Sequence, residues 1–329
     1  MRLDAPGPFT LAPATPIEPA SGEPLTCRFL AEEPSGTTSK FDCVVAGGDV
    51  VKVKYGRNSE IHAEMAATRL LRGLGYAADD VTIARRVRCY GCPRYPFITM
   101  RLLSLVSATN LLSPYGLDDG YTDFEWVAVE RKFPAAGIET GTQKGWGWWE
   151  LKASEASPGE LDAFRLLAVF LAHWDNKAEN QRLVCLDARP AAADTPCARP
   201  VAMMQDLGST FGPTKVNLAQ WHNLPVWKDR RACTVSMRLL PFGGATFPDA
   251  RISEAGRLQL ARQLESITDG DIERLFAEAR FPQFLSGTDD TGDLAAWQAA
   301  FRHRVDQIVT GGPCPDPDSS LPLDGSHVD

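Results

Sequence analysis

The stretch 171–185 marks the point where a helical pattern gives way to an apolar run, and it reads Leu-Ala-His-Trp-Asp-Asn-Lys-Ala-Glu-Asn-Gln-Arg-Leu-Val-Cys. It places Asp175 and Asn180 five residues apart. A second acidic residue, Asp206, ends a short apolar segment further along the chain. Hard cations such as Mg²⁺ take oxygen ligands, which the Asn180 amide and the Asp206 carboxylate supply. The pattern predicts that a helix ends at a polar loop beside a candidate metal site.

The segment before this loop carries the signals of a long buried helix. Ser157-Pro-Gly-Glu160 is a capping box with proline at the first helical position. The helix is predicted to run to about His173. Its apolar stripe consists of Leu161, Phe164, Leu167, Ala168 and Leu171.

Two strands are predicted earlier in the chain, over 41–46 and 49–55, because Gly47-Gly48 is a strong two-residue hairpin signal. The second strand alternates, so that Lys52 and Lys54 lie on one face and valines lie on the other. A solvated sheet edge explains the two lysines equally well.

A helix is predicted over 59–74, with a serine cap at its start and glycines at its end. Glu60 and Glu64 share one face of this helix with Ala67 and Leu71. An unpaired buried carboxylate is costly, so an acidic residue in an apolar helical face needs a cationic partner.

Residues 33–40 form a small polar loop between two strand-like segments and read Glu-Pro-Ser-Gly-Thr-Thr-Ser-Lys. Backbone N–H groups in such a loop can bind phosphate oxygens, and hydroxyl and ammonium groups add further donors. The candidate phosphate-binding residues are Gly36, Thr37, Ser39 and Lys40. An ordinary hairpin turn is the alternative interpretation.

Taken together, the order lysine, glutamate, Asp-x-x-x-x-Asn and Asp-x-Gly over residues 33–212 resembles the protein-kinase-like superfamily. The likeness is to atypical members, namely HipA-type, phosphoinositide and secretory-pathway kinases, in which a short Val-x-Lys strand precedes a helix reading Glu-x-Ala-Ala. In this chain Glu64-Met-Ala-Ala67 matches the helical part. The resemblance implies an α+β, bilobal protein-kinase-like fold with an antiparallel-sheet N-lobe and a mainly helical C-lobe.

The resemblance also implies roles for individual residues. Lys52 is expected to hold the ATP phosphates with Glu64 as its partner, and Lys54 and Glu60 are the alternates for that pair. Asp175 is expected to act as the catalytic base, His173 to brace the loop, and Asn180 and Asp206 to bind Mg²⁺. The hinge that hydrogen-bonds adenine is expected near 130–133.

The chain departs from ordinary protein kinases at several positions. Trp174 stands where those kinases have arginine, and Leu207 stands where they have phenylalanine. An Ala-Pro-Glu motif after Asp206 and a G-x-G-x-x-G loop are both missing from the sequence. These differences argue against regulation by loop phosphorylation and against a conventional peptide-binding platform.

The function predicted from these features is that of an ATP- and Mg²⁺-dependent phosphotransferase. The acceptor of the phosphoryl group is a protein, a lipid headgroup or a small molecule such as a sugar, and transfer of AMP is a further possibility. Two alternatives stand beside it: a nucleotide-binding pseudokinase, and an exported, disulfide-stabilised interaction protein.

The expected domain organisation has four parts. Residues 1–26 carry six prolines and are predicted to form a disordered or extended lead-in. The N-lobe is expected over 27–133, β-rich with one helix, and the C-lobe over 134–310. Residues 311–329 carry four aspartates and no lysine or arginine, and they are predicted to be a disordered acidic tail.

The charge and the hydropathy of the sequence argue against two kinds of partner, nucleic acid and a membrane that the chain would span. The formal net charge is −8 and the chain has no basic block, which argues against nucleic acid as a partner. No run of eighteen apolar residues occurs, so the sequence predicts no membrane span.

Eight cysteines leave three interpretations open. Disulfides are favoured, since an even number of this size is typical of an oxidising compartment, and Cys185 and Cys197 bracket one loop at a suitable spacing. Unbonded buried thiols and a zinc site built on Cys89-x-x-Cys92 are the alternatives. The cysteine content favours an exported or extracytoplasmic protein, although the N-terminus lacks a signal-peptide pattern.

Overall fold

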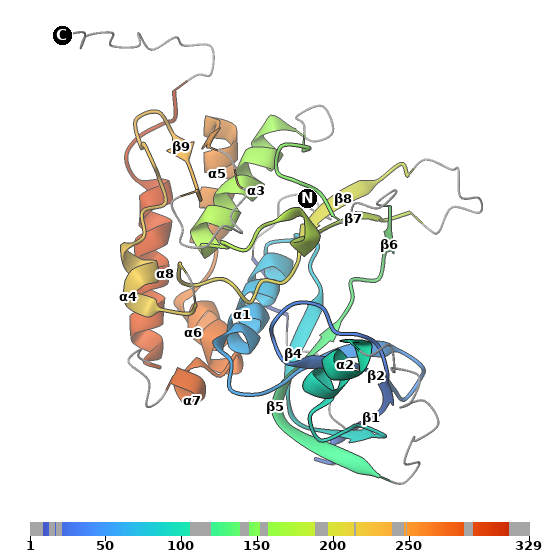
Figure 1. Cartoon of the computed structure of the whole chain (residues 1–329). Helices are drawn as coiled ribbons and strands as arrows, with labels where there is room; N and C mark the ends of the chain where they lie inside the picture. The colour runs from blue at the N-terminus through green and yellow to red at the C-terminus, as the bar shows by residue number, and fades with distance from the viewer. Residues whose placement is uncertain are drawn as a thin grey trace, which may run out of the picture.

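The longest strands lie in the first half of the chain and most of the helices in the second, as the computed structural model in Figure 1 shows. The structure describes residues 9–12, 17, 22–105, 120–138, 145–151, 157–187, 197–213, 215–238, 247, 249–285 and 292–315. Most of the predicted lead-in 1–26 and acidic tail 311–329 lies outside these residues. The fold is a mixed one of strands and helices, as the sequence predicts.

Five strands close into a barrel in the order β1-β2-β3-β5-β4. Their bounds are β1 Leu25–Leu30, β2 Lys40–Val45, β3 Val50–Lys54, β4 Asp80–Tyr90 and β5 Tyr121–Arg131. Neighbours pair antiparallel except β1 and β4, which are parallel and complete the ring. The expected antiparallel sheet is therefore closed into a barrel by one parallel pair. Closure buries one alternating face of every strand in a common core that includes Cys43, Val51, Val53, Val87 and Val129.

Local sequence signals account for the β2–β3 hairpin but not for the segment after β4. Gly47 and Gly48 have φ values of 99° and 91°, as the predicted two-residue turn requires. The short apolar run at 95–105 predicts a strand, but this prediction is wrong, because the segment is the helix α2, Pro96–Leu105. Its buried residues are Pro96, Phe97 and Met100, a helical spacing that a short apolar run hides from the sequence.

Two further helices begin at the caps expected for them or one residue away. Helix α1, Ser59–Gly73, is capped by Asn58, whose side chain accepts a hydrogen bond from the Glu60 N–H. Helix α3, Pro158–Leu171, begins as predicted, with the Ser157 hydroxyl accepting from the Glu160 N–H. It ends at Ala172, whose φ of 55° turns the chain into the loop that follows.

The C-terminal half is mainly helical. Its helices are α4 Leu218–Asn223, α5 Glu254–Glu265, α6 Asp269–Glu278, α7 Phe281–Leu285 and α8 Leu294–Val309. Serine and aspartate caps predict helices over 253–264 and 269–279 and a third is predicted over 294–309, close to α5, α6 and α8, whereas 218–227 is predicted to be irregular and contains α4. Two small sheets accompany them: β6 Ala136–Gly137, β7 Gln181–Cys185 and β8 Pro200–Met204 form one, and β9 Thr234–Val235 and β10 Ala250–Arg251 form the other.

One hydrophobic core joins α1 to the C-terminal helices, and in Figure 1 α1 lies between the barrel and this group. Within it, the buried Arg304 of α8 fixes the end of α3. Its guanidinium donates to the carbonyls of Val169 and Phe170, at 2.9 Å each, and to the Trp221 carbonyl at 2.8 Å. The last carbonyls of a helix lack some of their intrahelical partners, and Arg304 donates to two of them while it ties α3 to α4.

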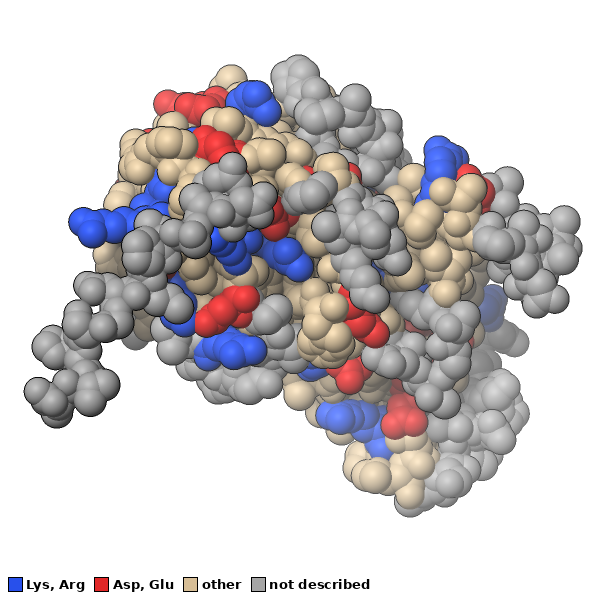
Figure 2. Space-filling model, turned by 90° about the horizontal axis from the view of Figure 1, so that it is seen from above, with Lys and Arg blue, Asp and Glu red and all other residues tan. Residues whose placement is uncertain are grey.

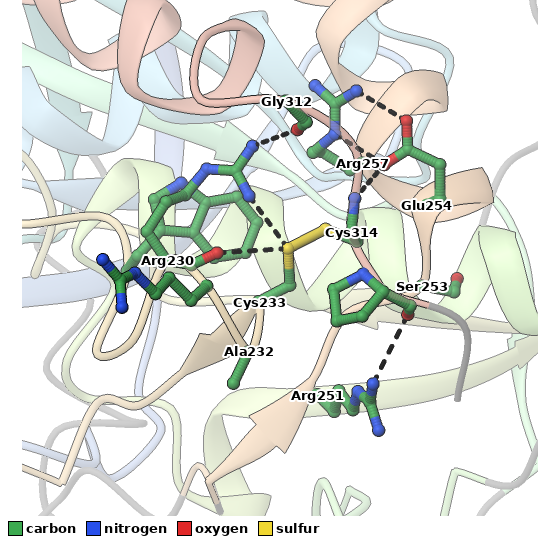
Figure 3. The surroundings of a disulfide bond; sticks show 12 residues. Arg230, Ala232, Cys233, Arg251, Ser253, Glu254, Arg257, Gly312 and Cys314 are labelled. Atoms are coloured by element: carbon green, nitrogen blue, oxygen red, sulfur yellow. Dashed lines mark hydrogen bonds and ion pairs between the residues drawn. A yellow bond between two sulfur atoms is a disulfide. The ribbon is translucent and has the colours of Figure 1, made fainter. Parts of the chain in front are cut away.

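All eight cysteines are described, and they pair as Cys27–Cys43, Cys89–Cys92, Cys185–Cys197 and Cys233–Cys314. The disulfide prediction is confirmed, and the zinc and unbonded-thiol alternatives are excluded. Figure 3 shows Cys233–Cys314 holding the segment after α8 beside α5, where Glu254 accepts from the Cys314 N–H and from Arg257. Four disulfides are compatible with an extracytoplasmic location.

Surface charge and hydropathy add two observations. On the face shown in Figure 2, the lysine and arginine side chains lie interspersed with aspartate and glutamate and do not gather by sign. None of the helices in the described part of the chain is both long enough and apolar enough to cross a bilayer.

Candidate active site

One face of the barrel sheet carries charged side chains, and it is the face opposite the apolar barrel interior. Lys40 lies opposite Lys54 in the β2–β3 ladder, and Lys52 lies opposite Glu130 in the β3–β5 ladder. Residues opposite each other in a ladder project to the same side, and so do residues two apart on a strand. The hairpin and β5 therefore place three lysines and Glu130 together.

Lys54, and not Lys52, forms the strand–helix ion pair. The Lys54 ammonium lies 2.5 Å and 2.6 Å from the two carboxylate oxygens of Glu64 in α1. The expected Lys52–Glu64 pair is replaced by the alternate lysine, while Lys52 lies 3.6 Å from Glu130. The lysines share a face, so the sequence could not separate them. Only the tertiary packing of α1 brings Glu64 to Lys54.

Lys54 is shared among three carboxylates. Besides Glu64, it lies 3.3 Å from Oε2 of Glu130 and 3.3 Å from Oδ1 of Asp206. Lys54, Glu64 and Glu130 are each less than 5% exposed. A buried charge is tolerated only with partners of opposite sign, and here each partner is itself a charged group.

The pKa values follow from this sharing. Burial acts to lower the pKa of Lys54, but Glu64, Glu130 and Asp206 outweigh it and hold the pKa well above the usual value. Burial raises the pKa of Glu64, and Lys54 offsets this only in part. Burial also acts to raise the pKa of Glu130, but Lys54, Lys52 and Lys132 outweigh it and hold the pKa well below its usual range. Lys54 lowers the pKa of Asp206.

Residues of the loop after α3 make hydrogen bonds and an ion pair with one another. The Asn180 side-chain amide donates to the backbone carbonyl of Asp175 at 2.9 Å, and the Asp175 carboxylate pairs with Lys177 at 3.1 Å. His173 is fully buried, its carbonyl accepts from the Asn176 side chain at 2.8 Å, and burial lowers the pKa of its ring to about 4. The ring is therefore neutral at pH 7.

A two-stranded ladder brings Asn180 beside Asp206, although 26 positions separate them in the numbering. Strands β7 and β8 pair antiparallel from Gln181 opposite Met204 onward. Just beyond that pair, the Gln205 N–H donates to the Asn180 carbonyl at 2.9 Å. The two predicted metal ligands therefore stand at the same end of one hairpin.

The polar loop 33–40 docks where α1 begins. The Thr38 hydroxyl donates to the Glu60 carboxylate. Glu60 also packs against Gly208 of the Asp-x-Gly segment. A Cβ at Gly208 would lie 2.8 Å from the Glu60 Cβ, so only glycine fits there. Gly36 lies next to the Lys40 ammonium, which a Cβ at Gly36 would approach to 3.3 Å.

These elements surround a cavity of about 360 Å³, called the lysine cavity below. Four predicted site residues line it, namely Lys40, Lys52, Asn180 and Asp206, together with the alternate Lys54. Glu64 stands behind Lys54, whereas Gly36, Thr37, Ser39 and Asp175 are absent from the described lining. Glu130 and Lys132 of the expected hinge segment also line it, and the lining residues that sequence reasoning missed are Ser35, Glu179, Arg182 and Gln205.

Asp79 is a further residue that sequence reasoning missed, and it hydrogen-bonds to the segment expected to be the hinge. Its Oδ1 accepts from the Phe133 N–H at 2.8 Å. Its Oδ2 accepts from the Gln205 side chain at 2.7 Å and from Lys132 at 3.2 Å. Asp79 is only 6% exposed. The one sequence signal for it was an acidic residue directly before an apolar strand.

A second cavity of about 570 Å³ lies on the other side of Lys132. It is lined by Asp49, Val50, Arg72, Tyr76, Ala78, Asp80, Arg131, Lys132, Phe133 and Pro134. It is larger than the lysine cavity, but Asn180 and Asp206 line the lysine cavity alone. The two predicted metal ligands therefore belong to the lysine cavity.

Comparisons with known proteins yield one structural likeness. No protein-family model matches the chain, and no curated protein matches it. Among solved structures, the chain is similar to the crystal structure of the Golgi casein kinase, with 12% sequence identity over 87% of this chain and 71% of that chain. The TM-score is 0.37. At that identity and score, the likeness assigns the chain to no family.

Proposed function

We propose that this chain is an ATP- and Mg²⁺-dependent phosphotransferase of atypical kinase type, with the barrel and the helical half as two lobes facing the lysine cavity. The observation that carries the proposal is the meeting of Lys54, Glu64 and Asp206 at this cavity, with Asn180 on its wall. A lysine held by a helical glutamate beside a metal-binding aspartate is the arrangement used in phosphoryl transfer.

The donor atoms suit a hard cation. Asp206 offers a carboxylate whose pKa Lys54 lowers, so it is ionised at pH 7. The nitrogen of the Asn180 amide is engaged by the Asp175 carbonyl, which makes its oxygen the atom that faces a cation. Carboxylate and amide oxygens are the ligands that Mg²⁺ takes. When bound, Mg²⁺ would neutralise charge on the phosphates.

Phosphate binding and proton transfer are assigned to protein side chains. Lys54 binds phosphate oxygens, and Glu64 orients the lysine while Glu130 shares its charge. Asp175, which pairs with Lys177, accepts the proton of the acceptor hydroxyl. The four disulfides favour an acceptor outside the cytoplasm, carried by a protein, a lipid headgroup or a small molecule.

The test is thermal unfolding of the full chain with and without ATP and Mg²⁺. A ligand that binds only the native state at one hundred times its Kd adds about 2.7 kcal/mol of stability, which raises the midpoint measurably. We expect this shift to require Mg²⁺ and to be lost in Asp206→Ala. The exposed Asp269 supplies the control, and Asp269→Ala should keep the shift. No shift at saturating ATP would refute the proposal.

A second measurement separates transfer from binding. With ATP labelled on the γ-phosphate, we expect the label to appear in a phosphorylated product or in free phosphate released by hydrolysis. Asp175→Asn should abolish this release of label while keeping the thermal shift. Label transferred from the α-phosphate would instead assign AMP transfer. A metal-dependent shift without either label would identify a nucleotide-binding pseudokinase.

A further inference from the structure

The described residues that line the lysine cavity are all polar or charged, unlike those of most small-molecule sites. We propose that it selects its phosphate donor by the phosphate chain and not by the base. Nucleoside triphosphates with different bases, and inorganic tripolyphosphate, would then bind comparably. This inference rests on the proposed phosphotransferase function and adds the class of donor to it.

The charge of the cavity favours a polyanion. Its described lining holds five cationic residues, Lys40, Lys52, Lys54, Lys132 and Arg182, and three anionic ones, Glu130, Glu179 and Asp206. The cationic groups are in excess before any metal ion is counted. They also come from separate elements, with β2, β3, the end of β5 and β7 each contributing. Several cations spread along a cavity match a chain of phosphates better than one anionic group.

The cavity offers little for a base to stack on. Among its described lining residues, none is aliphatic or aromatic. Small-molecule sites that hold flat rings are lined mainly by apolar and aromatic side chains. Here the sheet face opposite the metal ligands presents Lys52 flanked by Asp42 on β2 and Glu130 on β5. A base placed against these charges would desolvate them without compensating contacts.

The backbone donor expected to read a base is already engaged. The Phe133 N–H donates to Asp79, and the other oxygen of that carboxylate is held by Gln205 and Lys132. A base could use this N–H only by breaking its hydrogen bond to a buried carboxylate that two further donors hold in place. Leaving such a group without partners is costly. Lys132 itself is drawn toward Asp79 and Glu130, between the lysine cavity and the larger cavity beyond it.

The same bonds break and form with either phosphate donor. The bond between the terminal phosphorus and its bridging oxygen breaks, and a bond to the acceptor hydroxyl oxygen forms while Asp175 takes the hydroxyl proton. The leaving group is a nucleoside diphosphate from a nucleoside triphosphate and pyrophosphate from tripolyphosphate. The reaction needs no oxidant or further co-reactant.

Titration calorimetry of the full chain with Mg²⁺ tests the inference, using ATP, GTP, UTP, inorganic tripolyphosphate and adenosine as ligands. We expect Kd values for the three nucleotides to agree within about fivefold, a difference of about 1 kcal/mol. Tripolyphosphate should bind within about tenfold of ATP, or about 1.4 kcal/mol, and adenosine should not bind.

A site that hydrogen-bonds one base rejects another by about 100-fold or more. ATP binding that much tighter than GTP and UTP, or binding of adenosine alone, would overturn the inference while leaving the phosphotransferase proposal intact. Binding of none of the four phosphate ligands would instead refute the phosphotransferase proposal itself.

A lysine variant supplies an independent readout. Lys52→Met should weaken all four phosphate ligands by the same factor, about tenfold for the loss of one charged contact of about 1.4 kcal/mol. Lys228→Met, at an exposed lysine paired with Asp249 and outside the described lining of this cavity, should change none of them. A loss confined to ATP would show that Lys52 reads the base and would contradict the inference.

Discussion

Lys54 of β3 donates to both carboxylate oxygens of Glu64 in α1, and each side chain is almost wholly buried. This pair joins the barrel to a helix that also packs into the core of the C-terminal helices. It therefore couples the stability of the fold to the geometry of the lysine cavity.

Replacing Lys54 should destabilise the protein far more than replacing Lys52. Lys54→Met leaves Glu64 buried without a cation, and breaking a buried ion pair costs about 3–5 kcal/mol. The Lys52 side chain is 24% exposed and 3.6 Å from Glu130, and such partly solvated pairs contribute up to about 1 kcal/mol. Urea unfolding of both variants measures the difference, and equal losses would contradict the assignment of the pair. The double variant Lys54→Met/Glu64→Leu should recover part of the loss.

A glycine substitution tests the joint between α3 and α5. A Cβ at Gly256 would lie 2.5 Å from the Asp162 Cβ and 2.9 Å from the Gly159 carbonyl. Alanine gains about 1 kcal/mol in helix propensity, but overpacking costs about 1–3 kcal/mol and also shifts the helix that carries the 173–180 loop. We expect Gly256→Ala to lower the unfolding free energy.

Gly270 provides the matched control in α6, because its added Cβ would meet nothing closer than the Thr268 hydroxyl at 3.9 Å. Gly270→Ala should stabilise the protein by about 0.5–1 kcal/mol. If both alanine variants were stabilised alike, the close approach of α3 and α5 would be wrong.

The disulfides should differ in their contribution to stability according to the loop that each one closes. Cys233–Cys314 spans a sequence separation of 81, and Cys185–Cys197 spans 12. Loop-closure entropy predicts losses of about 4.5 and 3 kcal/mol for the paired serine variants. Denaturant unfolding of the two double variants gives the order. A larger loss at the short loop would show that local contacts, and not chain entropy, dominate.

Mild acid should destabilise the protein in part through His62. Its Nδ1 lies 2.7 Å from the Ala279 carbonyl, and burial lowers the pKa of its ring from 6.5 to about 4. The unfolded chain therefore takes up a proton at a higher pH than the folded chain. Stability is full above about pH 6.5 and is lost as the pH falls toward 4.

The His62→Gln variant isolates this contribution. Between pH 7 and pH 4.5, its unfolding free energy should fall by about 2 kcal/mol less than that of the parent protein. His303 is exposed, and His303→Gln should leave the pH dependence unchanged. An unaltered acid response in His62→Gln would assign acid sensitivity to the buried carboxylates instead.

The elements that could be predicted from the sequence are those whose signals are local. The Gly47-Gly48 turn, the Ser157 cap and the alternation of β3 each depend on neighbouring residues, so they could be predicted without knowledge of the fold. Sequence reasoning also selected Lys40, Lys52, Asn180 and Asp206, which the fold brings to one cavity. The helix at 96–105 was missed because ten residues of apolar character fit either period.

What the sequence by itself determined was the set of charged residues and the helix and strand that carry each one. Only the tertiary structure decided that Lys54 and not Lys52 meets Glu64, that Asp79 engages the Phe133 N–H, and that Cys233 pairs with Cys314. The physical reason is that these contacts join segments distant in sequence. Their partners follow from how α1, β5 and α8 pack, and a local pattern carries no information about packing.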